Sequence, residues 1–520
     1  MSTTDRAAAD AAGVPRLSDR IKRVAWASAA AQALGEAISL GQTVVVARLL
    51  TPADVGLFAA GTVLTAFLAE FTEGGLRSAL VNRGHAVQEA AETVFWATLF
   101  SGIALCAGSL AAAPLIGLVF GDPTAGLIAA VSSGGLVLYS LANVPEAFLQ
   151  REFSVWRRLL VGPAVSIAFA GVTISLAASG AGVWSLVAGS YASYVTLVVM
   201  VWCLCGWRPG AVRPSVRMWR ELARYGFPLV MASFASKARQ LLEAVVVGRF
   251  LDVAALGQYR YGLRIARVPT NALIEIVANA LFPAFSQLAA DRARLGQAYL
   301  RALGWVTFCS APVSGLLLAI GEPAAVVVLG EPWRAAGIVL VAMAGLGLGK
   351  AFASVSEEAI KGFGRTSVIN WFTAVEVVLG LGLLVLVLPL GLVGVGLAIS
   401  VTAIVVGVQC VVTARSVLDV RWRDVVRATV PAVVAALVAA AVTHVLDVQV
   451  LQPDHRSTLL AVAFLALDAV TYLVLYLTAF TAITPQTATG LLAALRRRRP
   501  RGAHRTSGRR AGRRAGRRTG

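Results

Sequence analysis

Residues 44–61 read VVVARLLTPADVGLFAAG, and a related stretch, VVVGRFLDVAALGQYRYG, occupies residues 245–262. The second copy begins 201 positions after the first, and each joins the end of an apolar run to a turn punctuated by glycine. The recurrence of an apolar segment followed by an arginine and a turn indicates that the chain contains its fold twice. Repeats of this kind in a hydrophobic chain are typical of transporters with two lobes around a central site.

The repeat continues beyond this first pair of segments. The stretch from Pro114 to Pro123 resembles that from Pro323 to Pro332, and Gly182 with the following valine resembles Gly394 with its valine. The small drift in spacing is what short loop insertions produce. Six apolar segments separate equivalent positions, so we expect both copies to enter the membrane in the same sense, as a parallel repeat.

The composition requires most of the chain to face lipid. Hydrophobic residues make up 58% of the sequence, charged residues only 14%, and the mean hydropathy is +0.75. Soluble chains carry roughly a quarter charged residues. The formal net charge is +19, but twelve arginines lie between Arg496 and Arg518, which leaves +7 for the rest of the chain. The basic character therefore belongs to the tail.

A helix needs about 20 apolar residues to cross the hydrocarbon core. The sequence predicts about fourteen such segments, at 24–47, 55–80, 93–118, 124–147, 159–180, 183–205, 223–247, 257–284, 300–321, 335–360, 367–390, 392–414, 425–446 and 458–482. We therefore expect an all-α integral membrane protein with two six-helix bundles and two extra C-terminal helices. The expected division is 1–23 cytoplasmic segment, 24–205 N-lobe, 206–222 basic cytoplasmic linker, 223–414 C-lobe, 415–482 appended pair and 483–520 disordered tail.

Charge in the connections predicts the orientation. Basic residues gather on one set of alternate connections, for example Arg157, Arg213 and Arg423, whereas acids such as Asp122 and Asp252 mark the other set. Basic loops stay in the cytoplasm. We expect both termini there, in the bacterial cytoplasmic membrane, and no cleavable signal peptide.

The five cysteines lie in apolar runs without the spacing of a zinc or redox motif. No catalytic motif stands out, so we expect no catalytic residues, no metal site and no cofactor.

The segment 257–284 carries a polar stripe that is costly in lipid. Its members recur every three or four residues, which places them on one helical face: Arg260, Arg264, Arg267, Asn271, Glu275 and Asn279. Each charge at the bilayer centre costs about 2.5–3.5 kcal/mol, so we expect this face to line a solvated cavity, with a kink at Pro269. The alternative is a stripe that only pairs with neighbouring helices, with Arg260 shallow enough to reach interfacial water.

Other charges within the predicted spans give the two lobes opposite sign. The N-lobe carries Glu36 and Glu70, whereas the C-lobe adds Lys237, the repeat equivalent of Glu36, and Lys350 to the arginines. The two acids are candidates for ion coupling, since burial raises the pKa of a carboxyl group, or for structural hydrogen bonding. A cationic cavity suits a phosphate or pyrophosphate group, which arginine can bind with two hydrogen bonds.

Three further acids within the predicted spans are Glu243, Glu376 and Asp468. Arg239 and Glu243, one turn apart, are expected to neutralise each other, whereas Glu376 and Asp468 are each expected to stand alone.

The sequence resembles that of bacterial polysaccharide flippases. The resemblance rests on RLLTPADVGLF at 48–58, EGGL at 73–76, ALV at 79–81 and FPAFS at 282–286, and extends over residues 17–482. These transporters form the polysaccharide branch of the multidrug/oligosaccharidyl-lipid/polysaccharide (MOP) exporter superfamily. The resemblance implies a protein that moves an oligosaccharide on a polyprenyl pyrophosphate between leaflets, by alternating access between two bundles. It implies pyrophosphate contacts at Arg264 and Arg267 first, then Lys237 and Lys350, with a polysaccharide polymerase and export machinery as possible partners.

Two other functions compete with this interpretation. A multidrug antiporter of the same superfamily needs a carboxylate-rich cavity for cationic drugs, which Glu36 and Glu70 can supply, although the arginines oppose it. A membrane glycosyltransferase or polymerase places catalytic acids on a sizeable loop or domain, but the connections here are short.

The arginine-rich tail is expected to adhere to anionic lipid, worth about 1 kcal/mol per arginine near the surface, or simply to extend into the cytoplasm. It lacks interleaved aromatic residues, so we expect no nucleic-acid binding.

Overall fold

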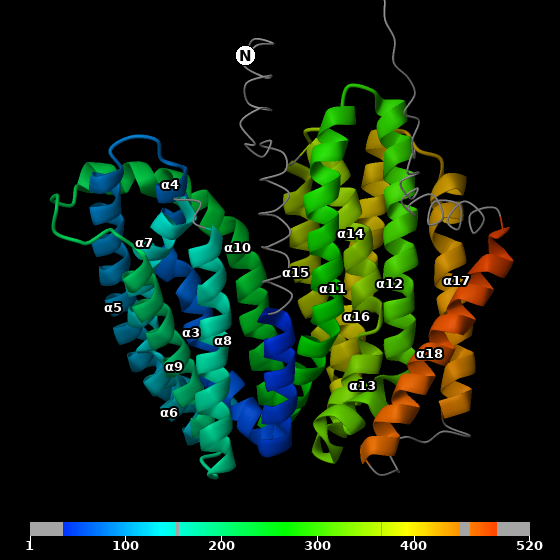
Figure 1. Cartoon of the computed structure of the whole chain (residues 1–520), viewed down its shortest axis with the longest axis horizontal. Helices are drawn as coiled ribbons and strands as arrows, with labels where there is room; N and C mark the ends of the chain where they lie inside the picture. Colours follow the sequence, from blue (N-terminus) through cyan, green and yellow to red (C-terminus); the bar gives the residue numbers. More distant parts are fainter. Residues whose placement is uncertain (1–34, 152–154, 366, 448–457, 486–520) are drawn as a thin grey trace, which may run out of the picture.

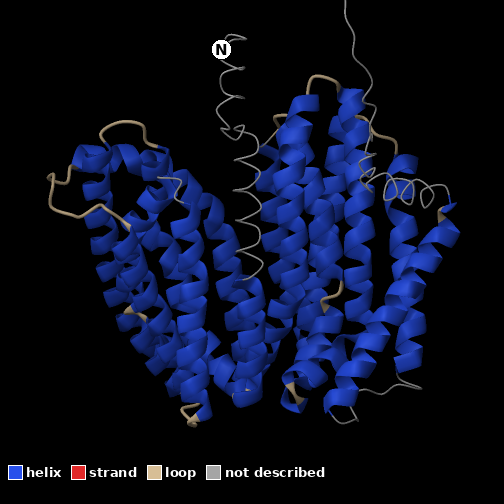
Figure 2. Ribbon diagram, in the orientation of Figure 1, coloured by secondary structure: helices blue, strands red, loops and turns tan. Residues whose placement is uncertain are grey.

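The computed structural model describes residues 35–151, 155–365, 367–447 and 458–485, which are helical with short connections and no strand (Figure 2). The arginine-rich tail and the start of the first predicted span lie outside these residues. The first part contains a helix at 35–49 and then α3 (Pro52–Glu73), α4 (Leu76–Asn82), α5 (Val87–Phe120), α6 (Pro123–Ser132), α7 (Gly135–Arg151), α8 (Val155–Ala178) and α9 (Val183–Leu204).

The second part repeats this order and adds a pair of helices. It contains α10 (Val216–Phe250), α11 (Val253–Leu288), α12 (Arg292–Leu329), η1 (Glu331–Trp333), α13 (Arg334–Ala342), α14 (Gly345–Gly362), α15 (Ser367–Val387), η2 (Leu388–Leu390), α16 (Gly391–Leu418), α17 (Trp422–Leu446) and α18 (Thr458–Ile483). Figure 1 shows two bundles that converge at one end and diverge at the other, with α17 and α18 on the outer side of the second bundle.

Large apolar side chains cover the outside of the bundles. Phe100 is 65% exposed, Leu118 75% and Val378 74%, a surface that only lipid can solvate. In the described part, nine helices are long and apolar enough to cross a membrane, or ten if the bent pair Glu331–Ala342 and Gly345–Gly362 is one span. The protein is therefore a multi-pass membrane protein, and the count of fourteen spans stays a prediction. The helices α10 and α11, which carry most of the charged candidates, are not among these apolar helices.

Several helices extend beyond the apolar runs that predicted them. For example, α12 has 38 residues and α10 has 35, whereas the predicted spans contain only the apolar core. Both helices begin with polar turns capped by a side chain: Asp291 accepts a hydrogen bond from the backbone of Arg294, and Ser215 accepts one from Met218. The extra turns lie at the diverging end, where α10 and α12 begin (Figure 1).

Each copy of the repeated stretch, at 44–61 and at 245–262, contains the start of a helix. Thr51 and Asp54 form a capping box at α3, with Thr51 accepting from the Asp54 amide at 3.2 Å and Asp54 accepting from the Thr51 amide at 3.0 Å. Asp252 caps α11 in the equivalent place by accepting from the Ala255 amide. Each cap satisfies backbone N–H groups that have no partner within the helix, so the motif fixes where the second helix of each half begins.

The glycines of this motif bring the two halves together. A β-carbon on Gly56 would overlap the carbonyl of Val253, and one on Gly257 would overlap the carbonyl of Pro52. These two contacts are equivalent under the 201-residue repeat, so each half presents the same surface to the other. That reciprocity is the property of an interface with twofold symmetry, and it supports the parallel repeat. Only glycine permits backbones to approach this closely.

The converging end is also joined by hydrogen bonds between the halves. Arg48 donates to the carbonyl oxygens of Val327 at 2.6 Å and Val328 at 3.1 Å, in the last turn of α12. The indole of Trp333 donates to the Ala47 carbonyl at 2.7 Å. A cation is favourable at a helix C-terminus, where carbonyl groups lack helical partners. These contacts hold the converging end closed.

At the diverging end, the start of α10 is tied to the first bundle. Arg83 forms an ion pair with Glu221 at 3.0 Å, and the hydrogen bond from this guanidinium lowers the pKa of the Glu221 carboxyl group. Gly226 lies against the α3–α4 turn, because a β-carbon there would overlap the backbone of Gly74 and Gly75. Farther along, α10 also packs against α11 and α15, so this helix contacts both bundles.

Two spans predicted as continuous helices are broken in the structure. The segment 124–147 divides into α6 and α7, and the segment 335–360 divides into α13 and α14 with a bend of 42°. At the first break, the Val131 carbonyl accepts from both the Gly134 amide and the Tyr191 hydroxyl, and at the second Ser400 donates to the Ala342 carbonyl at 2.6 Å. The two acceptors lie 211 positions apart, close to the repeat spacing, and each donor comes from the last helix of its six-helix repeat. A broken helix in a membrane needs such partners for its free backbone groups, so the same device occurs in both lobes.

Candidate functional site

The arginine stripe belongs to α11, a helix of the second bundle that packs against α3 of the first (Figure 1). Arg264 is exposed and donates to the side-chain hydroxyl of Ser39, on the 35–49 helix, and more weakly to its carbonyl at 3.4 Å. Arg267 is half-buried and has no hydrogen-bond or ion-pair partner among the described residues. The Nε of Arg260 is buried and likewise unpartnered within the described residues. Asn271, farther along this face, is exposed.

Two residues expected at the end of this stripe, Glu275 and Asn279, have side chains outside the described set. The helix itself runs without a break through Pro269 and Pro283.

Unlike the arginines of α11, Lys237 has a carboxylate partner. Its ammonium group lies 2.5 Å from a carboxylate oxygen of Glu70, so α10 of the second half is paired with α3 of the first. The sequence proposed Lys237 as a cavity cation and Glu70 as an ion-coupling acid, and the structure brings the two together. Glu36, the other proposed acid, is exposed.

Lys350 belongs to a network of charges within the C-lobe. It lies 2.8 Å from Glu376, and Arg239 contacts the same carboxylate at 3.3 Å. Arg239 also pairs with Glu243, which confirms the interaction expected from their spacing, and the Tyr259 hydroxyl donates to Glu243 at 3.3 Å. The prediction that Glu376 stands alone is wrong, because its partners come from helices that local spacing cannot relate.

The charges of this network balance, with two cations and two carboxylates. Arg267 is close enough to act on Glu376 electrostatically, so Arg267 and Lys350 contribute to one positive field. Of the five proposed cations, Lys237 and Lys350 have carboxylate partners, whereas the three arginines of α11 have none among the described residues. The arrangement can therefore attract an anion mainly through α11, and most directly through Arg264 and Arg267.

Asp468, also expected to stand alone, is fully buried in α18 and interacts electrostatically with Asp447 at the end of α17. That interpretation is therefore wrong as well. Among the described residues, no three His, Cys, Asp or Glu side chains gather in a way that could hold a metal ion.

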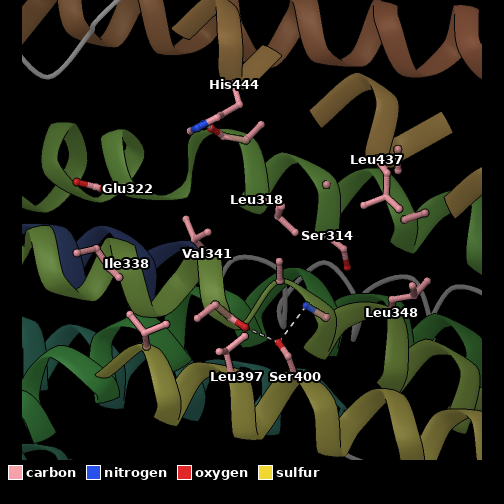
Figure 3. Close-up of a pocket in the computed structure, with 18 of the residues that line it drawn as sticks. Ser314, Leu318, Glu322, Ile338, Val341, Leu348, Leu397, Ser400, Leu437 and His444 are labelled. Atoms are coloured by element: carbon pink, nitrogen blue, oxygen red, sulfur yellow. Dashed lines mark hydrogen bonds between the residues drawn. The ribbon is translucent and has the colours of Figure 1, made fainter. Parts of the chain in front are cut away.

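A groove of about 880 Å³ lies elsewhere, between α12, α13, α14, α16 and α17 (Figure 3). Its walls are apolar, with Leu318, Val341 and Leu397 among them, and Glu322 and His444 lie toward one end. None of the proposed cations lines it. Ser400, which bonds to Ala342 and Gly345 at the α13–α14 break, lies on its wall.

Comparison with known proteins identifies relatives along much of the chain. A family model described as "Polysaccharide biosynthesis protein" matches residues 45–337. The succinoglycan biosynthesis transport protein ExoT of Rhizobium meliloti (strain 1021) is 29% identical over 344 residues, covering 64% of this chain and 67% of the relative. The lipopolysaccharide biosynthesis protein WzxC of Escherichia coli (strain K12) is 24% identical over 340 residues, covering 64% of this chain and 68% of the relative.

Solved structures share the fold. That of the lipid II flippase MurJ in an inward closed conformation matches with a TM-score of 0.71 at 15% identity, covering 89% of this chain and 99% of the other. An inward-facing multidrug resistance MATE family transporter of the MOP superfamily matches with a TM-score of 0.60 at 19% identity, covering 74% and 94%. The likeness confirms the predicted all-α membrane fold.

Proposed function

Since the chain belongs to the polysaccharide biosynthesis protein family, we propose that it flips a polyprenyl-(pyro)phosphate-linked oligosaccharide across the cytoplasmic membrane, for export of a cell-surface polysaccharide. The names of its relatives, a succinoglycan transport protein and a lipopolysaccharide biosynthesis protein, support this class of substrate. The glycan crosses without chemical change, so the activity is transport rather than catalysis, and the product passes to polymerisation and export machinery.

The observation that carries this proposal is the unpaired cation stripe of α11. A cation in a membrane helix is expensive unless a solvent or ligand compensates it, and Arg264 is exposed and Arg267 half-buried on the helix that packs against the first half. Their guanidinium groups can each donate two hydrogen bonds to phosphate oxygens. Lys237 and Lys350 add to the positive field while paired with Glu70 and Glu376.

Alternating access gives the lobes their roles. We propose that residues 24–205 and 223–414 rock against each other, with 206–222 as the cytoplasmic linker and 415–482 as an appendix to the second lobe. The basic connections lie at the diverging end, which supports taking that end as the cytoplasmic one. The arrangement is then inward-open, with Arg48 and Trp333 closing the opposite end. The headgroup would enter from the cytoplasm, bind α11 and leave once the converging end opens.

Reconstituted protein tests the proposal directly. Liposomes would contain a polyprenyl-pyrophosphate disaccharide with a nitrobenzoxadiazole label on the glycan, and dithionite, which does not cross the membrane, would bleach only the outer leaflet. We expect the protein to extend bleaching from the outer-leaflet share to nearly the whole label. A headgroup-labelled phosphatidylcholine should stay at its outer-leaflet share. Bleaching equal to that of protein-free liposomes would contradict the proposal.

The same liposomes can be used to test whether the protein is instead a cation antiporter. A cation antiporter would release a trapped cationic dye when a pH gradient is applied. The structure disfavours that function, because one of its two candidate acids, Glu70, is neutralised by Lys237. Dye efflux without movement of the glycan would favour the antiporter.

The proposed orientation yields a separate prediction. In a background without the five native cysteines, Asp122→Cys and Arg213→Cys should react with an impermeant maleimide from opposite sides of the membrane, Arg213→Cys from the cytoplasm. Spheroplasts label the outer side, and inverted vesicles label the inner side. Reaction of both cysteines from one side would refute the orientation.

A further inference from the structure

The first three turns of α10, residues 216–227, carry large apolar side chains on their outer side. Val216 is 71% exposed, Trp219 44% and Phe227 62%, and these three residues are called the apolar stripe below. The opposite side of the same turns, which includes Met218, is buried in the core formed with α4 and α5. The apolar stripe therefore has no cover from the described part of the protein, and an exposed apolar patch marks a contact with a partner or a membrane.

Arginines flank the apolar stripe. Arg217, Arg220 and Arg224 recur every three or four residues, so they share one side of the helix, called the basic face below. All three are exposed, and none has a hydrogen bond or ion pair among the described residues. The single acid of these turns, Glu221, is paired with Arg83. The basic face thus carries three positive charges that the described residues do not neutralise.

The length of α10 places these turns at the membrane surface. Its 35 residues span about 52 Å, whereas the hydrocarbon core is about 30 Å thick. The helix ends at the converging end, where α11 follows directly, so its first turns extend past the hydrocarbon at the diverging end (Figure 1). A helix with an apolar side and a basic side fits that boundary, because acyl chains and headgroups meet there.

We propose that the start of α10 binds anionic phospholipid headgroups, with the basic face on their phosphate groups and the apolar stripe among the first carbons of the acyl chains. A guanidinium group can donate two hydrogen bonds to phosphate oxygens. A zwitterionic headgroup carries an ammonium group that offsets its phosphate, so the basic face favours an anionic lipid.

This surface is separate from the arginine stripe of α11, and the inference does not depend on the proposed transport of a glycolipid. Its consequence concerns the helix that contacts both bundles. Lipid bound at the start of α10 holds that end of the helix at the bilayer surface.

The test uses the full-length protein in phosphatidylcholine nanodiscs, with a bimane fluorophore on Val216→Cys in the background without the five native cysteines. The nanodiscs also contain phosphatidylglycerol or phosphatidylcholine, at one mole fraction, with a nitroxide on the acyl chain near the headgroup. A nitroxide quenches bimane only at close range. We expect stronger quenching by the labelled phosphatidylglycerol, which would show that anionic lipid is enriched beside the start of α10.

Replacement of the basic face by glutamine, with Arg217→Gln, Arg220→Gln and Arg224→Gln combined, should lower the ratio of the two quenching constants to about one, because each arginine near the surface contributes about fivefold in affinity. Trp219→Gln should instead reduce quenching by both lipids, since it weakens insertion of the apolar stripe and leaves the charge unchanged. Circular dichroism and elution volume would establish that each variant is folded.

The matched control combines Arg292→Gln, Arg294→Gln and Arg301→Gln, which removes the same charge from exposed positions near the start of α12, at the same end of the protein. It should leave the ratio unchanged. Equal quenching by both lipids in the unmodified basic face, or a ratio that survives its replacement, would overturn the proposal. Loss of the preference in millimolar inorganic phosphate would also overturn it, because the surface would then bind free phosphate. Absence of quenching by either lipid would mean that the apolar stripe does not face the bilayer.

Discussion

Arg267→Ala should lower flipping of the labelled lipid-linked disaccharide about tenfold or more, because a charge-assisted hydrogen bond contributes roughly 1.5–3 kcal/mol. Arg267 has no partner among the described residues, so its whole hydrogen-bonding capacity is free for phosphate. Arg264→Ala should have a smaller effect, since part of that side chain's capacity is directed to Ser39. Lysine at either position should restore activity only in part, because lysine keeps the charge and loses the planar fork of donors.

The measurement is the initial bleaching rate in dithionite at matched protein density in the liposomes. Arg301→Ala is the control, because Arg301 is exposed on α12 and its hydrogen bond goes to Gln297 of its own helix. Circular dichroism and elution volume would establish that each variant is folded. If both α11 variants flip at the unmodified rate, the arginines are structural and the phosphate site lies elsewhere.

Local sequence was enough to predict those parts of the site that lie within one helix. The stripe of α11 follows from spacing by three and four, and the pair Arg239–Glu243 follows from spacing by four. The repeat could be read from two short motifs, because caps and close-packed glycines restrict which residues can occupy them. Even the break in the fourth span had a local signal, the sequence SSGG at 132–135, although the apolar run around it favoured a continuous helix.

The contacts between helices could not be predicted in the same way. Glu376 meets Lys350 and Arg239 across 26 and 137 positions, and Glu70 meets Lys237 across two halves of the repeat. Periodicity says which face of a helix is polar, but not which neighbour that face meets. Acids such as Glu376 and Asp468 therefore seemed isolated, and Lys237 and Lys350 seemed free, until the packing of the helices placed partners beside them.

The close packing of α3 against α11 leads to the last prediction: Gly56→Val and Gly257→Val should each prevent closure of the converging end and stop transport. A side chain at either position meets backbone atoms of the other helix, and backbone cannot rotate away as a side chain can. Overpacking of this kind costs about 1–3 kcal/mol. The reciprocity of the contact predicts that the two substitutions act alike, although the residues lie in different halves.

Spin labels on Asp122→Cys and Glu331→Cys, in the background without native cysteines, would report the separation of the two loops by double electron–electron resonance. Both valine variants should shift the distance distribution to longer values, with alanine at the same positions giving a smaller shift. Gly108→Val is the control, because Gly108 is exposed on α5 and a β-carbon there meets nothing within 4 Å. A distribution unchanged by Gly56→Val would mean that this contact does not hold the end closed. A shift caused by Gly56→Val but not by Gly257→Val would contradict the twofold relation between the halves, because equivalent contacts must respond equally.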